Sequence, residues 1–364
     1  MLFPAVGKVL RNGNYVKKYL KDDVLKWTTA VPCVKLQKRE DHIFNTAYSI
    51  MDASGLIFKC PGCEAEFEAD LSLIGTESSC PECGIRFIVP IPETEVGLDI
   101  AGFRLKRKLG QGGMGEVWLA AQSTMDRDVA IKILSPELVK NADFVKRFEH
   151  EVRIAGKLHH PNIITAFHAG HVQGLYYLAM NYVDGVELAD RLKIEKRIPE
   201  KDALRIARDI ASALDYAWTE FKILHRDIKP SNIMMDKRNN ALLMDMGISK
   251  SMIDDFSMTV SGMVVGTPYY ISPEQARGDK NVDFHSDIYS LGATLYHLLT
   301  GNFPFDGEST LVIMTKHITE ALVPPQKLNP ELSSATCDLI MKMMSKNWRD
   351  RQASWQNVVS DIDL

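Results

Sequence analysis

The sequence lacks an excess of charge of either sign. Its 43 Lys and Arg residues nearly balance 47 Asp and Glu residues, and the formal net charge is −4. A protein that binds nucleic acid or an anionic membrane through its overall field is usually strongly basic. The chain as a whole therefore indicates neither partner.

Long apolar runs are also missing. The longest uncharged stretches, 256–273 and 288–305, are interrupted by Gly, Pro, Ser, Thr, Asn or His, so neither predicts a membrane-spanning helix. The first residues contain too short an apolar run to form a secretory signal. With 45% hydrophobic and 25% charged residues, the composition is that of a globular protein. We expect a cytoplasmic protein without a membrane span.

Cysteine is scarce, and four of the six cysteines form one pattern. Two Cys-x-x-Cys pairs, Cys60 with Cys63 and Cys80 with Cys83, are separated by sixteen residues. Without an export signal, this spacing favours thiolates around a metal ion, and a redox pair or two disulfides are the alternative. A short strand-like segment follows each pair, so the pattern resembles a small bacterial zinc ribbon. Four protein ligands leave no open coordination position, which predicts a structural Zn²⁺.

Composition divides the chain into regions. Residues 1–50 contain nine Lys or Arg and four Asp or Glu, and they form an unassigned basic segment. Residues 51–100 contain two Lys or Arg and ten Asp or Glu. The ribbon is placed at 56–92, and this acidic balance disfavours a nucleic-acid role for it. A linker is expected at 93–100, after a Pro-punctuated stretch. Met51 is an alternative start of the protein.

Residues 101–364 have the pattern of one α+β unit. Strand-like runs cover 103–109, 116–121 and 128–134. Helical spacing of apolar residues follows at 203–217, and 288–299 is apolar on nearly every side, as expected of a buried helix. A strand-rich part followed by a helical part predicts two lobes.

A glycine-rich segment at 109–117 lies between the first two strands. Its Gly-x-Gly-x-x-Gly pattern is weak evidence alone, but the glycines enter a strand rather than a helix, which disfavours a dinucleotide site. Glycine lets the backbone approach phosphate oxygens without an intervening side chain. Seventeen residues after Gly115, a Val-Ala-Ile-Lys sequence places Lys132 on a third strand.

Further motifs follow in order along the chain. They are Glu151 in a helical stretch, His225-Arg226-Asp227 with Lys229 and Asn232, Asp245-Met246-Gly247, Ser272-Pro273-Glu274, and Arg351. Over about residues 100–364, these ordered motifs make the chain resemble the bacterial eukaryotic-like (Hanks-type) serine/threonine protein kinases. The resemblance implies a bilobal protein kinase fold with a β-rich N-lobe and a helical C-lobe. It also implies transfer of the ATP γ-phosphate to Ser or Thr hydroxyls of protein substrates, with ATP and Mg²⁺ (or Mn²⁺) as cofactors and self-association for trans-autophosphorylation.

The resemblance also implies individual roles. Asp227 would orient the substrate hydroxyl and accept its proton, and Lys229 would contact the transferred phosphate. Lys132 would hold the α- and β-phosphates while paired with Glu151. Asn232 and Asp245 would ligate Mg²⁺. The implied ATP-binding residues are Leu109, Gly110, Gln111, Gly112, Gly113, Met114, Gly115, Glu116, Val117, Ala130, Lys132, Met180, Asn181 and Val183. Glu274 and Arg351 would form a buried ion pair.

Two residues depart from the family pattern. Met246 replaces the usual Phe and Ser272 the usual Ala, and neither change removes a chemical group.

Two alternative functions are disfavoured by the sequence. The first, a pseudokinase scaffold, is disfavoured because the phosphate-, metal- and proton-binding residues are all present. A nucleic-acid-associated regulator built on the ribbon is disfavoured by its acidity, although the basic first 50 residues could act as an arm.

Regulation is expected in the segment between Asp245 and Glu274. In the resembling family, an Arg at the position of Arg226 receives a phosphate from this segment. Thr259 and Ser261 are the predicted phosphosites, with Lys250 as a second positive charge. Thr267 is expected to bond near Asp227 and Lys229 instead.

Overall fold

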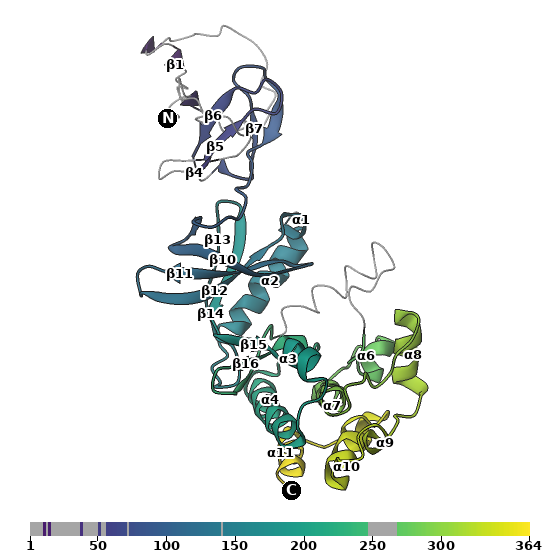
Figure 1. Cartoon of the computed structure of the whole chain (residues 1–364). Coiled ribbons are helices and arrows are strands. Elements are labelled where there is room, and N and C mark those ends of the chain that lie inside the picture. The colour runs from purple at the N-terminus through teal and green to yellow at the C-terminus, as the bar shows by residue number, and fades with distance from the viewer. Residues whose placement is uncertain are drawn as a thin grey trace, which may run out of the picture.

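A small N-terminal module stands over two stacked lobes in the computed structural model of the chain (Figure 1). The structure describes residues 10–11, 14–15, 37–38, 50–51, 56–70, 73–139, 141–246 and 268–364. The side chains of the strands before residue 52, and those of Glu137, Ala142, Arg147 and Glu151, are not described. Among the described helices, none combines the length and the apolar composition needed to cross a bilayer.

The described residues of the N-terminal part include short antiparallel strands, and we call residues 56–92 the four-cysteine module. Its strands β5 and β6 pair with each other in a four-stranded sheet of order β3-β6-β5-β4, whose outer strands precede the module, and its β7 pairs with β8. Its small core includes Leu56, Phe67 and Val89, each at most 1% exposed. The strands are β1 (Leu10–Arg11), β2 (Asn14–Tyr15), β3 (Gln37–Lys38), β4 (Ile50–Met51), β5 (Leu56–Lys59), β6 (Glu66–Ala69), β7 (Glu77–Ser79) and β8 (Arg86–Ile88).

The first lobe is a six-stranded antiparallel sheet of order β13-β14-β12-β11-β10-β9. Its strands are β9 (Asp99–Ile100), β10 (Phe103–Gly112), β11 (Gly115–Gln122), β12 (Arg127–Leu134), β13 (Ala166–Val172) and β14 (Leu175–Asn181). The helices α1 (Pro136–Val139) and α2 (Ala142–Ala155) follow β12. The side chain of Asn141 caps α2 by accepting hydrogen bonds from two backbone N–H groups. The three strand-like runs predicted from the sequence are confirmed as β10, β11 and β12.

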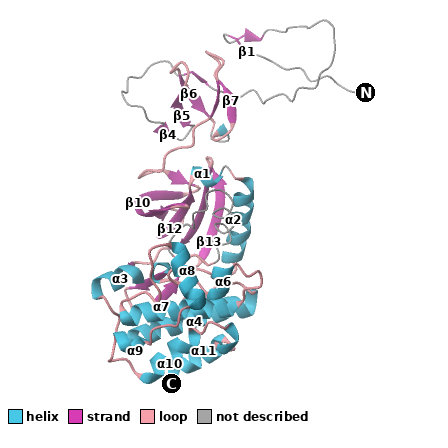
Figure 2. Cartoon of the chain, turned by 90° about the vertical axis from the view of Figure 1, so that its right-hand side faces the viewer, coloured by secondary structure: helices cyan, strands magenta, loops and turns pink. Residues whose placement is uncertain are grey.

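The second lobe is mostly helical (Figure 2). Its long central helices are α4 and α7, and the buried apolar face predicted at 203–217 lies on α4. Its elements are β15 (Gly185–Glu187), α3 (Leu188–Glu195), α4 (Glu200–Phe221), the 3₁₀ turn η2 (Pro230–Asn232), β16 (Ile233–Asp236), β17 (Ala241–Leu243), α6 (Pro273–Arg277), α7 (Phe284–Thr300), α8 (Thr310–Thr319), α9 (Pro325–Leu328), α10 (Ser334–Met343), the 3₁₀ turn η3 (Trp348–Asp350) and α11 (Trp355–Asp363).

Polar contacts fix the helices that follow residues 247–267, which lie outside the described part of the chain. The hydroxyl of Ser272 accepts a hydrogen bond from the N–H of Gln275, and the Gln275 side chain accepts one from the N–H of Ser272. This reciprocal cap satisfies N–H groups that the first turn of a helix leaves without partners. Arg351 and Glu274 form the predicted buried pair, with 2.6 Å between Nη1 and Oε1.

Candidate active site

A cavity of about 1170 Å³ lies between the two lobes. Both lobes contribute to its lining, which includes the glycine-rich turn between β10 and β11 and the segment 226–232 of the helical lobe. The sequence-predicted residues that line it are Leu109, Gly110, Gln111, Gly112, Gly113, Met114, Gly115, Val117, Ala130, Lys132, Met180, Asn181, Val183, Asp227, Lys229, Asn232 and Asp245. The fold thus brings most of the predicted ATP, metal and catalytic residues to one place.

Strand alternation decides which side chains of the sheet reach the cavity. Val117, Ala130 and Lys132 line it, while Trp118, Ile131 and Ile133 are buried in the core on the other face of the sheet. Side chains of successive strand residues point to opposite faces, so this division is expected. For the same reason Glu116 does not line the cavity, although it lies between two residues that do.

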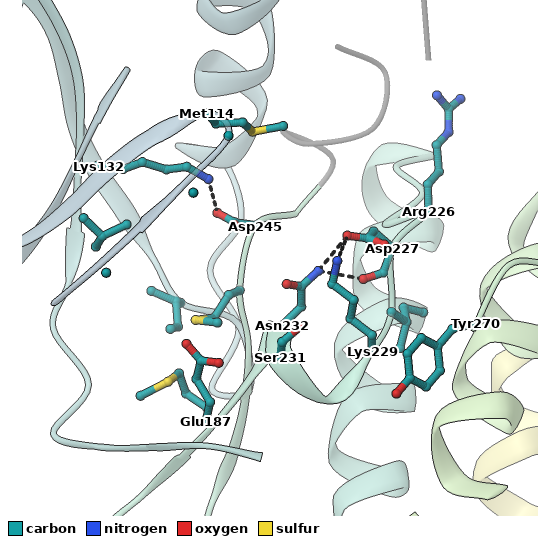
Figure 3. Close-up of a pocket in the computed structure, with 18 of the residues that line it drawn as sticks. Met114, Lys132, Glu187, Arg226, Asp227, Lys229, Ser231, Asn232, Asp245 and Tyr270 are labelled. Carbon is teal, nitrogen blue, oxygen red and sulfur yellow. Dashed lines mark hydrogen bonds and ion pairs between the residues drawn. The ribbon is translucent and has the colours of Figure 1, made fainter. Parts of the chain in front are cut away.

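An ion pair joins the lobes across the cavity. Lys132 Nζ on β12 lies 2.9 Å from Asp245 Oδ1, which follows β17 (Figure 3). The predicted partner of Lys132, Glu151, lies on α2, but its side chain is outside the described part of the chain. The pairing of Lys132 with Glu151 therefore stays a prediction.

Asp227 lies at the centre of a second cluster (Figure 3). Its Oδ2 is 2.7 Å from Lys229 Nζ and accepts a hydrogen bond of 3.1 Å from Asn232 Nδ2. Asn232 Nδ2 also donates to the Asp227 carbonyl oxygen at 2.7 Å. The carboxylate is therefore held by a cation and an amide, and Asp227 and Asp245 both line the cavity.

A buried carboxylate supports the backbone before Asp227, and the sequence reasoning did not assign this role. Asp287 on α7 accepts hydrogen bonds of 2.8 Å from the N–H groups of His225 and Arg226. Burial raises the pKa of Asp287, while His225 and Arg226 act in the opposite direction. Arg226 and Asp245 adopt φ values of 66° and 51°, a region that residues other than glycine rarely occupy. Such outliers are concentrated at functional sites.

Two further cavity residues were not found from the sequence. The side chain of Gln275 donates a hydrogen bond of 3.0 Å to the carbonyl oxygen of Arg226 and so links α6 to the segment before Asp227. Glu187 lines the cavity at the start of α3, and burial together with the charge of Asp190 raises its pKa, against the effect of Lys193. Neither position belongs to a motif, so only the three-dimensional arrangement identifies them.

Most of the predicted regulatory segment, residues 247–267, lies outside the described part of the chain. Thr259, Ser261, Lys250 and Thr267 lie outside the described residues. Met246, the residue in place of the usual Phe, is described and is buried in the main core of the helical lobe.

The four cysteines of the Cys-x-x-Cys pairs come together in the four-cysteine module. Their Sγ atoms all lie within 4.8 Å of one another. Cys60 Sγ is 3.7 Å from Cys83 Sγ, and Cys63 Sγ is 3.6 Å from Cys80 Sγ. Backbone N–H groups of Gly62 and Cys83 point to the sulfurs of Cys60 and Cys80. All five described cysteines are free thiols.

Comparisons with known proteins agree with the geometry. The family model of the protein kinase domain matches residues 103–361. The chain is 38% identical over 258 residues to the serine/threonine-protein kinase PknB of Mycobacterium leprae, covering 70% of this chain and 41% of that protein. It is 37% identical over 268 residues to the serine/threonine-protein kinase PrkC of Bacillus subtilis, covering 73% and 41%. The chain therefore spans about two fifths of the length of these relatives.

Solved structures show the same fold. The crystal structure of the Mycobacterium tuberculosis PknI kinase domain matches with a TM-score of 0.60 and 27% sequence identity. The match covers 74% of this chain and 98% of that domain.

Proposed function

We propose that this chain, which belongs to the protein kinase family, is an ATP-dependent serine/threonine kinase that phosphorylates protein substrates and itself. The observation that carries the proposal is the grouping of Lys132, Asp227, Asn232 and Asp245 around one interlobe cavity beneath a glycine-rich turn. Phosphoryl transfer depends mainly on positioning and on neutralising phosphate charge, and this cavity offers groups for both.

Each of these cavity residues has a specific role in the proposed phosphoryl transfer. Lys132 holds the nucleotide phosphates, and the carboxylate of Asp245 with the amide oxygen of Asn232 supplies the hard oxygen ligands that Mg²⁺ prefers. Bound Mg²⁺ neutralises charge on the phosphates. Asp227 orients the acceptor hydroxyl and takes its proton, and Lys229, 2.7 Å from Asp227, contacts the transferred group.

The decisive experiment compares the wild-type protein with Asp227→Asn. We expect the wild type to phosphorylate itself or a generic basic protein on Ser and Thr in the presence of Mg²⁺ and ATP. Loss of the proton acceptor should lower the rate by about two to four orders of magnitude. Transfer of radiolabelled phosphate, followed by phosphoamino-acid analysis, measures both the rate and the acceptor type.

A matched control separates chemistry from general damage. Asp338→Asn makes the same change at an exposed position of α10 outside the cavity and should keep the wild-type rate. An Asp227→Asn protein that transfers phosphate as fast as Asp338→Asn would contradict the assignment of Asp227.

We also propose that the four-cysteine module is a zinc ribbon that holds one structural Zn²⁺ through Cys60, Cys63, Cys80 and Cys83. Four thiolates around tetrahedral zinc have sulfurs about 3.8 Å apart, as follows from Zn–S bonds of about 2.3 Å. Two of the sulfur pairs are separated by 3.7 Å and 3.6 Å, close to that spacing. The core of the module is small, so metal binding would supply much of its folding free energy.

Metal analysis tests this second proposal. Protein purified under reducing conditions should contain one zinc per chain by elemental analysis, and Cys63→Ser should reduce that content strongly. Cys337→Ser, which changes a buried cysteine of the helical lobe, should leave it unchanged. Protein without zinc, or with disulfides among these four cysteines, would contradict the proposal.

A further inference from the structure

The segment that leaves the four-cysteine module is bonded to the strand-rich lobe. The N–H of Gly97 donates to the carbonyl oxygen of Leu105 at 2.8 Å, and the N–H of Leu105 donates to that of Leu98 at 2.9 Å. Leu98 also packs against the core of the strand-rich lobe. Gly97 and Leu98 therefore continue, beside Leu105, the edge of the sheet that β9 begins.

The module itself also contacts this lobe, over which it stands in both views (Figures 1 and 2). Ile91 packs against the module core and against the core of the strand-rich lobe. The contact lies at Gly174, in the turn between β13 and β14. A Cβ at this position would lie 2.9 Å from Ile91 Cγ1 and 3.3 Å from Ile74 Cγ2. Because Gly174 has no side chain and a φ of +73°, the turn can pass close under the module.

Between these two anchors, Thr94 reaches the back of the glycine-rich turn. Its Oγ1 donates a hydrogen bond of 2.5 Å to Oε2 of Glu116. The same carboxylate accepts hydrogen bonds from Lys108 Nζ at 2.6 Å and from Trp118 Nε1 at 2.9 Å. Partial burial favours a higher pKa of Glu116, but the bonds from Lys108, Thr94 and Trp118 outweigh it and lower the pKa.

The location of Glu116 gives this contact its importance. Glu116 pairs with Gln111 across the hairpin, and its chain neighbours Gly115 and Val117 both line the cavity. Its carboxylate is bonded on the opposite side, where Thr94 lies. The hydrogen bond therefore holds the glycine-rich turn from behind, on the face that no nucleotide would occupy.

We propose that Thr94 is a positioning residue for ATP binding: its hydroxyl, held by the docked four-cysteine module, anchors Glu116 and keeps the glycine-rich turn over the nucleotide. This role rests on one part of the proposed kinase function, namely that ATP binds in the cavity; it does not require phosphate transfer. The module would then support the ATP site of the same chain, whether or not it also binds a partner.

The test compares two substitutions at position 94. Thr94→Val keeps the shape and removes the hydroxyl, while Thr94→Ser keeps the hydroxyl. Because a hydrogen bond to a carboxylate is lost, we expect Thr94→Val to raise KM for ATP about three- to tenfold while kcat changes less than about twofold. Thr94→Ser should have the wild-type KM. Hydrogen exchange of the amides of 110–117 should be faster in the Val variant.

Two further variants exclude general effects. Thr76→Val makes the same change within the module, where the hydroxyl donates to the Leu73 carbonyl oxygen at 2.7 Å, and should leave KM unchanged. In a Glu116→Ala background, Thr94→Val should have no additional effect, because the bond is already absent. The proposal is overturned if Thr94→Val keeps the wild-type KM, if Thr94→Ser is equally impaired, or if Thr76→Val raises KM as much.

Nucleotide binding separates this proposal from the catalytic one. Calorimetric titration of a non-hydrolysable ATP analogue with Mg²⁺ needs no phosphate transfer. If the wild type binds the analogue but transfers nothing, the proposed kinase activity fails. A weaker Kd in Thr94→Val and a wild-type Kd in Thr94→Ser would still support the positioning role, and equal Kd values in all three proteins would overturn it.

Discussion

Arg351 carries its charge on a side chain with no solvent exposure. Its guanidinium donates to both carboxylate oxygens of Glu274, at 2.6 and 3.0 Å, and to the carbonyl oxygens of His285 and Ser345. The pair connects the segment before α11 with α6, so it links two parts of the helical lobe whose residues, Arg351 and Glu274, are 77 positions apart in the sequence. A buried pair of this kind is costly to break because the remaining charge stays desolvated.

We therefore expect Arg351→Met to lower the free energy of unfolding by about 3–5 kcal/mol, because Glu274 is left as an uncompensated buried charge. The double variant Arg351→Met/Glu274→Leu should recover much of this loss. Urea denaturation followed by circular dichroism measures both. As a matched control, Lys106→Met breaks the exposed pair with Asp128, where the two side chains are 47% and 42% exposed, and should cost less than about 1 kcal/mol. Equal losses in the two single variants would contradict this account.

At the scale of elements, the spacing of apolar residues predicted the helices and strands whose burial follows a regular pattern in the sequence. The helix expected at 288–299 is α7, and most of its residues are buried. The strand expected at 103–109 is longer, since β10 continues to Gly112. The glycines stay in the antiparallel ladder, in which Gly112 pairs with Gly115. Strand β13 was not predicted, because its sequence, with a central Gly170 and two histidines, has no clear apolar alternation.

Several features that sequence reasoning did not identify depend on partners that are distant in the sequence. Ser272 looked like a neutral replacement of Ala, but besides its local cap of α6 its hydroxyl lies 2.8 Å from the hydroxyl of Ser286, fourteen residues later. Glu116 belonged to the glycine-rich motif, and only the tertiary structure shows its carboxylate bonded to Thr94, 22 residues earlier. Motif order can locate the cavity residues, whereas a hydrogen bond between separate segments requires their relative placement.

At the scale of the whole molecule, the two lobes meet at the cavity, and the Lys132–Asp245 pair crosses it. A ligand that binds the folded cavity stabilises both lobes by mass action, by about 2.7 kcal/mol at a concentration of 100 times Kd. For lobes of this size, each kcal/mol corresponds to about 2–4 °C in Tm. A non-hydrolysable ATP analogue with Mg²⁺ should therefore raise Tm by about 5–10 °C.

The metal dependence of this shift tests the assignment of Asp245. Omitting Mg²⁺ should reduce the shift strongly in the wild type, because the nucleotide phosphates then lack their counter-charge. Asp245→Asn should show a small shift with or without Mg²⁺, while Asp338→Asn should behave like the wild type. Mg²⁺ is omitted rather than chelated, because a chelator would also compete for metal at the four cysteines. A Tm shift in Asp245→Asn that still grows with Mg²⁺ as in the wild type would show that other groups hold the ion, and would exclude Asp245 as the essential ligand.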